Sequence, residues 1–226
     1  MDLSRKIIDA SLLSGATMAG IARVDELKKT PSYDGCGGGV WPREVRSVLV
    51  VGLFHPVNKP ELDWYTGRGG TPGNRMLMRM AKVLELMLKE ECDVTARDLP
   101  YYVEQGGIFL KDAAVLAGFG SIGRNNLLIT PAHGPRVRLR ALSLNVELDS
   151  TGPIDFRPCD MCSVPCLRVC PHNAFETGNY QREACLKQMG VDEHEGYPLQ
   201  KVDDAASSHL CIKYCRRCEY TCPVGK

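Results

Sequence analysis

Two dense runs of cysteine near the end of the chain constrain its fold more than any other sequence feature. They are Cys159-x2-Cys162-x3-Cys166-x3-Cys170-Pro171 and Cys211-x3-Cys215-x2-Cys218-x3-Cys222-Pro223. Runs of this kind that end in Cys-Pro supply the ligands of bacterial-type [4Fe–4S] clusters, in which the fourth cysteine of one run reaches the other cluster. Two runs therefore predict two clusters.

A zinc ribbon is the alternative interpretation, because it also uses pairs of the form Cys-x2-Cys. A ribbon needs four cysteines, whereas nine of the eleven cysteines lie between Cys159 and Cys222, and the Cys-Pro endings have no role in it. We therefore expect iron–sulfur clusters rather than zinc.

Composition and charge limit the remaining function classes. The chain has 226 residues, of which 44% are hydrophobic and 24% charged, so it can form a core in one large domain or two modest ones. A net charge of +1 provides no electrostatic reason to expect nucleic acid as the main partner. The N-terminus lacks the apolar core of a signal peptide, and no apolar run approaches the ~18 residues of a membrane span. We expect a cytoplasmic protein without membrane contact, whose cysteines are reduced and bind metal.

Helix and strand patterns fill the first 150 residues. Apolar periodicity predicts helices over 3–13, 74–91 and 108–116, and strands over 18–22, 45–54, 99–103, 126–130 and 137–148. The strand over 45–54 is continuously apolar, which is typical of a central strand buried on both faces. Arg136, Arg138 and Arg140 alternate along the last strand, and we interpret them as a solvated or partner-facing surface. The segment 149–155 has the composition of a linker, so we expect an α/β domain over 1–150 and a cysteine domain over 151–226.

The segment Gly118-Phe-Gly-Ser-Ile-Gly123 matches the dinucleotide-binding pattern G-x-G-x-x-G. That pattern requires a strand before it and a helix after it, so that the pyrophosphate lies at the helix N-terminus. Here a helical pattern precedes the glycines and a strand follows them, so we reject a nucleotide site. The local residues favour a turn that ends the helix and packs on the sheet, although the polar residues 124–126 offer donors to a ligand.

The segment from Lys111 to Asn126, taken with the cysteine runs, resembles the epoxyqueuosine reductase and reductive dehalogenase family of cobalamin-dependent iron–sulfur enzymes. Ala19–Arg23 and Arg46–Gly52 match as well, and Cys185-Leu186 lies between the runs, so the resemblance extends over almost the whole chain. It implies an α+β protein in which a nitroreductase-like α/β domain binds a corrinoid (cobalamin) and precedes a dicluster ferredoxin-like domain.

The resemblance also implies positions for the functional residues. The corrinoid would contact the residues of the glycine segment, namely Gly118, Gly120, Ser121, Gly123, Arg124, Asn125 and Asn126. Glu104 matches an aspartate that is thought to donate a proton to the substrate in epoxyqueuosine reductase. A carboxyl partly desolvated beside a corrinoid would have a raised pKa suited to acid catalysis. An ordinary surface glutamate is the alternative.

The family pattern distributes eight cysteines over two clusters. One cluster would take Cys159, Cys162, Cys166 and Cys222, and the other Cys170, Cys185, Cys215 and Cys218. Cys211 is then left over, although a ligand set with Cys211 in place of Cys185 is the alternative because Cys211 belongs to the second run. The first run has three residues between Cys162 and Cys166 where the family usually has two, so we expect its ligand loop to bulge.

Three functions are compatible with this resemblance. In the first, an enzyme takes electrons from a donor such as a ferredoxin or flavodoxin and passes them through the clusters to a corrinoid, which reduces a small organic substrate. In the second, the chain only transfers electrons to, or handles the corrinoid of, another protein. In the third, a diverged member uses flavin or no corrinoid. The chain ends at Lys226 without the helical-repeat region of epoxyqueuosine reductase, so tRNA is not expected as a substrate.

Overall fold

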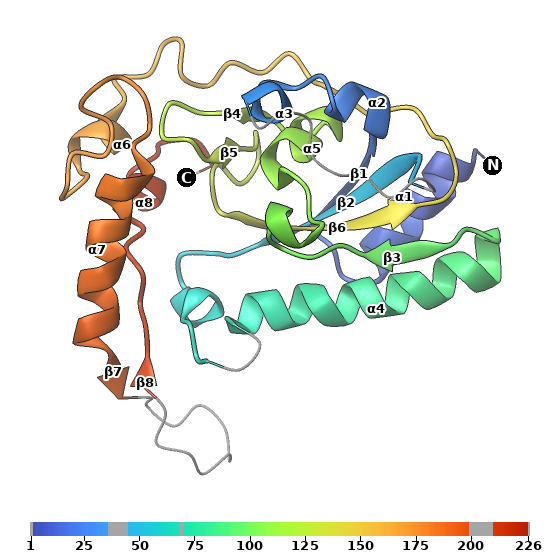
Figure 1. The fold of residues 1–226 in the computed structure, drawn as a ribbon, viewed down its shortest axis with the longest axis horizontal. Coiled ribbons are helices and arrows are strands. Elements are labelled where there is room, and N and C mark those ends of the chain that lie inside the picture. Colours follow the sequence, from blue (N-terminus) through green and yellow to red (C-terminus); the bar gives the residue numbers. More distant parts are fainter. Residues whose placement is uncertain (1, 36–44, 68–69, 199–209, 226) are drawn as a thin grey trace.

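A four-stranded antiparallel sheet forms the centre of the protein in a computed structural model that describes residues 2–35, 45–67, 70–198 and 210–225 (Figure 1). Its strands are β1 (Met18–Arg23), β2 (Ser47–Phe54), β6 (Val137–Leu144) and β3 (Ala96–Asp98), in the order β1-β2-β6-β3. The fold is therefore mixed α and β, as the sequence predicts.

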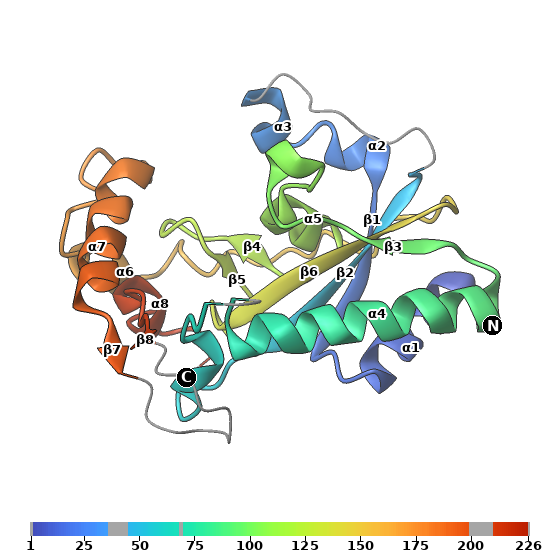
Figure 2. The same cartoon turned by 60° about the horizontal axis from the view of Figure 1, so that its bottom comes forward.

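Helices cover both faces of this sheet (Figure 2). One face carries α1 (Leu3–Leu13) and α4 (Pro72–Cys92), and the other carries α2 (Val24–Leu27), α3 (Pro31–Gly35) and α5 (Leu110–Leu116). Successive side chains of a strand point to opposite faces, so Leu49 and Val51 of β2 join the core beneath α4, whereas Val48 and Val50 join the core beneath α5. The predicted burial of this strand on both faces is confirmed.

Local sequence signals explain the bounds of α4, the longest helix described. Thr71 caps its start, because the Thr71 hydroxyl oxygen accepts a hydrogen bond from the Asn74 N–H at 3.1 Å. Pro72 occupies the first helical position, where a missing N–H costs nothing. Leu77, Leu84 and Leu88 lie at helical spacing and are buried against the sheet.

Two segments differ from the prediction. The strand expected over 99–103 lies earlier, at Ala96–Asp98, and is followed by the 3-10 turn η2 (Val103–Gln105). Pro100 has no N–H to continue the ladder, which explains the early end. The expected linker is held against β1 and α5, because the Thr151 N–H donates to Ile21 O at 3.0 Å and the Gly152 N–H donates to Leu116 O at 2.7 Å.

The cysteine-rich residues form a group of short elements at one end of the sheet (Figure 1). These are α6 (Pro165–Arg168), α7 (Arg182–Glu195), β7 (Tyr197–Pro198), β8 (Leu210–Cys211) and α8 (Arg217–Tyr220). The hairpin of β4 (Ser121–Ile122) and β5 (Leu128–Ile129) lies on the side of the sheet near this group, and η1 (Pro60–Asp63) follows β2. Among the described helices, none has the length and apolar character of a membrane span.

Candidate metal centre

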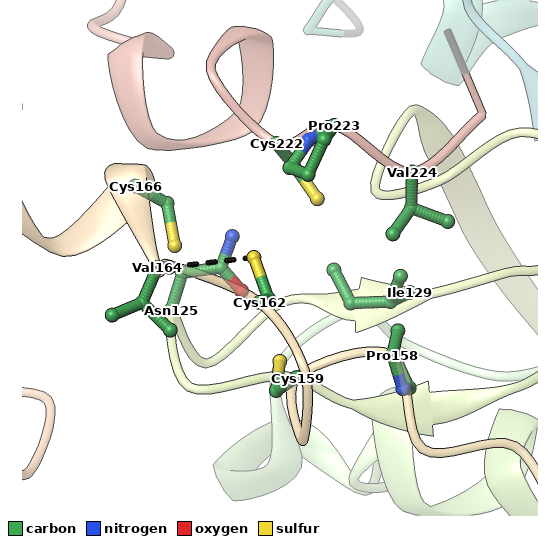
Figure 3. A pocket seen from close by; sticks show the side chains of 10 residues that line it. All are labelled: Asn125, Ile129, Pro158, Cys159, Cys162, Val164, Cys166, Cys222, Pro223 and Val224. Atoms are coloured by element: carbon green, nitrogen blue, oxygen red, sulfur yellow. Dashed lines mark hydrogen bonds between the residues drawn. The ribbon is translucent and has the colours of Figure 1, made fainter.

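Four cysteines from separate parts of the chain line one pocket. Cys159 and Cys162 lie in the loop before α6, Cys166 lies in α6, and Cys222 follows α8. Figure 3 shows their sulfur atoms turned toward a common space. The rest of the lining comes from Asn125, Ile129, Pro158, Val164, Pro223 and Val224. The structure thus brings together the four residues that the family pattern assigns to one cluster.

The electrostatics of this pocket favour a bound cation. Burial, followed by the charges of the neighbouring thiolates, raises the pKa of the Cys166 and Cys222 thiols. These two thiols therefore resist ionisation in the metal-free chain. A coordinated metal reverses this preference, because a thiol that binds a metal ion is deprotonated. Within the described residues, no group of three or more His, Cys, Asp or Glu side chains is arranged for a single metal ion.

The extra residue of the first run is accommodated by a left-handed turn at Val164. Its φ is +48°, a region that β-branched residues rarely adopt. In this conformation the Val164 N–H donates to Cys162 Sγ at 3.3 Å (Figure 3), and Pro165 begins α6 directly afterwards. The bulge expected between Cys162 and Cys166 is therefore present.

The second predicted set is partly assembled. Cys185, in the first turn of α7, lies close enough to Cys215 and Cys218 for its thiolate charge to raise the pKa of both thiols, after the larger effect of burial. The pKa of Cys218 reaches about 12. The Tyr180 hydroxyl hydrogen-bonds to Cys185, and burial with this bond raises the pKa of Tyr180. Cys170 Sγ accepts a bond from the Ala174 N–H at 3.2 Å.

Cys211 occupies a different environment from Cys185. It is 1% exposed and lies in β8, where its backbone pairs with Tyr197 of β7. Cys185, by contrast, is near enough to Cys215 and Cys218 for its charge to act on both of their thiols. The geometry therefore favours Cys185 as the eighth ligand, while the ligand assignment itself stays a prediction.

Asn125 lies between the two cysteine groups. Only 3% of it is exposed, it lines the pocket of Cys159 and Cys222, and its Nδ2 donates to Cys218 O at 3.4 Å. The adjacent Asn126 has φ +58° and is held by Lys111, whose Nζ donates to the Asn126 backbone oxygen at 2.7 Å and to its side-chain oxygen at 2.8 Å. The asparagines expected near a corrinoid are thus fixed against the cysteine segment and α5.

The glycines of the hairpin serve its packing. Gly120 has φ +152°, and a Cβ there would lie 1.9 Å from Ile129 O. A Cβ on Gly123 would lie 2.8 Å from a side-chain carbon of Ile129, and one on Gly118 would lie 3.2 Å from Thr151 O. A helix precedes the segment and strand β5 follows it, as predicted, while β4, whose Ser121 pairs with Ile129, lies within the segment and was not predicted. Contact of these residues or of the exposed Arg124 with a corrinoid stays a prediction.

Glu104 lies in η2 and is exposed to solvent. The rings of Tyr101 and Tyr102 beside it are 64% and 53% exposed and form an edge-to-face pair with centroids 5.3 Å apart. The partial desolvation that acid catalysis would require is therefore not provided by the chain around Glu104, and a bound cofactor or substrate would have to supply it.

The interpretation of Arg136, Arg138 and Arg140 as a solvated or partner-facing surface was wrong. Arg136 is 3% exposed and bonds to Gly225 O, three residues after Cys222. Arg138 pairs with Asp63 and Glu219, and Arg140 pairs with Asp98. The cysteine segment folds back onto this end of the sheet, so the guanidinium groups of Arg136 and Arg138 bind it. The guanidinium group of Arg140 instead pairs with Asp98 of β3.

His55 is a buried residue that sequence reasoning missed, because a lone histidine after a strand carries no pattern. It is 1% exposed, and its Nδ1 lies 2.9 Å from Asp63 Oδ1. Burial, followed by the charges of Arg138 and Arg216, lowers the pKa of His55 to about 3, so the ring is neutral near pH 7.

Comparison with known proteins identifies relatives of one kind, although no protein-family model matches the chain. It is 32% identical over 187 residues to an epoxyqueuosine reductase of Synechocystis sp., covering 79% of this chain and 62% of that protein. It is 25% identical over 195 residues to the epoxyqueuosine reductase of Lactococcus garvieae, covering 81% and 53%. The chain thus spans between about half and two thirds of the length of these relatives.

Solved structures share the fold. One is epoxyqueuosine reductase from Bacillus subtilis, with its catalytic loop swung out of the active site. The match to it has a TM-score of 0.68 at 18% identity and covers 99% of this chain and 65% of the reductase chain. The match to a catabolic reductive dehalogenase has a TM-score of 0.63 at 19% identity and covers 100% of this chain and 33% of the dehalogenase chain.

One similar structure corrects the expectation about tRNA. An epoxyqueuosine reductase with an epoxyqueuosine-modified tRNA-Tyr stem loop has a TM-score of 0.66 at 18% identity and covers 99% of this chain and 65% of that chain. The expectation that tRNA is not a partner relied on the position of the last residue, and the tRNA-bound relative contradicts it.

Proposed function

Because this chain is similar in sequence to epoxyqueuosine reductases and in fold to an epoxyqueuosine reductase and a reductive dehalogenase, we propose that it is an iron–sulfur oxidoreductase of this family. In this proposal the cysteines of residues 151–226 would hold two [4Fe–4S] clusters, the nitroreductase-like domain of residues 1–150 would hold a corrinoid, and the clusters would supply the electrons for its reduction. The observation that carries the proposal is the pocket in which Cys159, Cys162, Cys166 and Cys222 face one another.

This pocket suits a cubane cluster in its donor set and its surroundings. Four thiolates are the usual ligands of a [4Fe–4S] cluster, and hydrogen bonds to the sulfurs tune its potential. The Val164 N–H provides one such bond, and the apolar side chains of Ile129 and Val224 limit the access of water. The second cluster would be bound by Cys170, Cys185, Cys215 and Cys218.

The hairpin is the proposed contact between the clusters and the corrinoid. Asn125 touches both cysteine groups, and Lys111 holds Asn126 in place. Exposed Arg124 and Glu104 remain available to a ligand, Arg124 as a donor and Glu104 to hold a proton at its carboxyl group. A bound corrinoid would supply the reducing chemistry itself, while the chain positions it and sets its electronics.

We propose an organic substrate, with an epoxyqueuosine-modified tRNA stem loop as the first candidate because a structural relative was solved with one. A ferredoxin or flavodoxin in the cytoplasm is the proposed electron donor. A second candidate function is that of an electron carrier without a corrinoid of its own. It is favoured by the exposure of Glu104 and by the hairpin glycines, whose conformations already serve internal packing.

Anaerobic reconstitution with iron, sulfide and hydroxocobalamin, followed by gel filtration, tests these functions. We expect about eight irons per chain, because each of the two cubanes has four, together with one co-eluting corrinoid. Reduction of the modified stem loop in the presence of reduced flavodoxin would then establish the enzyme. Intact clusters without corrinoid would overturn the enzyme in favour of the carrier, and zinc in place of iron would contradict both.

A further inference from the structure

Two carboxylates and two arginines form a closed ring that joins the cysteine segment to the sheet. Arg138 Nε lies 2.7 Å from Asp63 Oδ1, and Arg138 Nη2 lies 2.9 Å from Glu219 Oε2. Arg216 closes the ring, because its Nε donates to Glu219 Oε2 at 3.0 Å and its Nη1 bonds to Asp63 Oδ2. We call Asp63, Arg138, Arg216 and Glu219 the docking ring.

The docking ring is largely buried. The side chains of Asp63 and Glu219 are 8% and 5% exposed and that of Arg216 is 12% exposed, whereas that of Arg138 is 29% exposed. Ionised side chains are found at such depth only when they are paired and hydrogen-bonded, because removal from water is costly. The two positive and two negative charges balance. The loss of any one member therefore leaves a net charge in a poorly hydrated space.

The position of the docking ring in the chain connects it to the second cysteine group. Arg216 directly follows Cys215, and Glu219 directly follows Cys218. Asp63 and Arg138 come from η1 and β6 of the α/β part. Cys215 and Cys218, the two cysteines of the second run proposed for this cluster, are thus each followed by a residue whose side chain is paired with the α/β part. His55 is packed against the ring through Asp63.

We propose that the docking ring positions the cluster of Cys215 and Cys218 against the α/β domain and sets its reduction potential. The inference rests on the proposed function for the presence of that cluster. On reduction the cluster takes one electron from the donor and gains one negative charge, with no bond formed or broken. Net charge around a cluster is one determinant of its potential. An excess of negative charge in the ring disfavours the reduced state, and an excess of positive charge favours it.

Paired variants of opposite sign test this inference. Arg138→Met leaves the ring negative, and Asp63→Asn leaves it positive. Arg140→Met is the matched control, because Arg140 lies on the same face of β6 but pairs with Asp98 of β3. Each variant and the wild type are reconstituted anaerobically, their iron is counted, and the potential of each cluster is measured by a dithionite titration followed by electron paramagnetic resonance.

We expect Arg138→Met to lower the potential of one cluster, so that its reduced-to-oxidised ratio at a fixed applied potential falls about tenfold, which is ~59 mV for a one-electron couple. Asp63→Asn should shift the same cluster in the opposite direction. Arg138→Lys keeps the positive charge and should leave the potential near that of the wild type. Arg140→Met should change the potential of neither cluster.

Shifts of the same sign in both variants, or unchanged potentials with iron retained, would overturn the inference while leaving the proposed function intact. A wild type without iron would overturn both. If Arg138→Met fails to fold, Asp63→Asn and Arg138→Lys decide the question, because a raised potential in the first and a near-normal potential in the second are both required.

Discussion

Replacement of Cys185 or Cys211 by alanine should separate a cluster ligand from a packed thiol. Cys185 lies in the first turn of α7 beside Cys215 and Cys218, whereas Cys211 is buried in β8. The two cysteines are rivals for the same role in the sequence pattern. Their different surroundings predict opposite effects on iron content and on the stability of the metal-free chain.

The expected magnitudes follow from burial. Cys211 is 1% exposed, so Cys211→Ala removes one buried sulfur, comparable with one methylene group, at a cost of about 1 kcal/mol. For a chain of this length such a loss lowers the Tm by about 2–4 °C. Cys185 is only half-buried, so Cys185→Ala should change the Tm of the metal-free chain less. It removes one of four ligands, however, and iron should fall from about eight to about four per chain.

Two measurements distinguish the variants: iron content after anaerobic reconstitution, and thermal unfolding of the metal-free chain by circular dichroism. Cys92→Ala is the control, because Cys92 ends α4 outside the cysteine segment, and its iron content should match that of the wild type. Full iron in Cys185→Ala would refute the ligand assignment. A loss of half the iron in Cys211→Ala would refute it as well, whatever the result for Cys185.

Three further predictions concern the fold and the proposed site. Gly73→Ala should destabilise the protein by about 1–3 kcal/mol in urea unfolding, because the alanine Cβ would lie 2.1 Å from Cε1 of buried His55. Alanine favours a helix more than glycine does, so increased stability would contradict this packing. The lowered pKa of His55, about 3 against 6.5, means that the unfolded chain binds the proton first, so stability should fall as pH decreases from 6.5 toward 3, on the order of 1 kcal/mol per pH unit. His55→Phe should reduce this slope in urea titrations between pH 4 and 7, and an unchanged slope would exclude His55 as its source. Glu104→Gln should abolish turnover while corrinoid still co-elutes, whereas retained turnover would assign the proton to another group.

Much of the architecture was predictable because its signals are local. The helices α1 and α5 and the buried strand β2 follow from the spacing of apolar residues, which the covalent chain sets directly, although α5 begins at Leu110 rather than at the predicted residue 108. The rejected dinucleotide site followed from the order of helix and strand around Gly118–Gly123. The prediction placed strand β3 too late in the chain, at 99–103 instead of Ala96–Asp98, because the position of this strand depends on pairing with β6 rather than on its own residues.

The sequence by itself determined where the cysteine runs lie and predicted thiolate ligands from them, and only the tertiary structure decided what surrounds these cysteines. Cysteine spacing within the two runs predicted two clusters, while the family resemblance implied which cysteines belong to each of them. The approach of Cys222 to Cys159, the burial of Asn125 between the two groups and the pairing of Arg138 with Glu219 join residues far apart in the chain. Such contacts depend on how the cysteine segment packs on the sheet. For the same reason, arginines that resemble a solvated row in the sequence bind that segment in the fold.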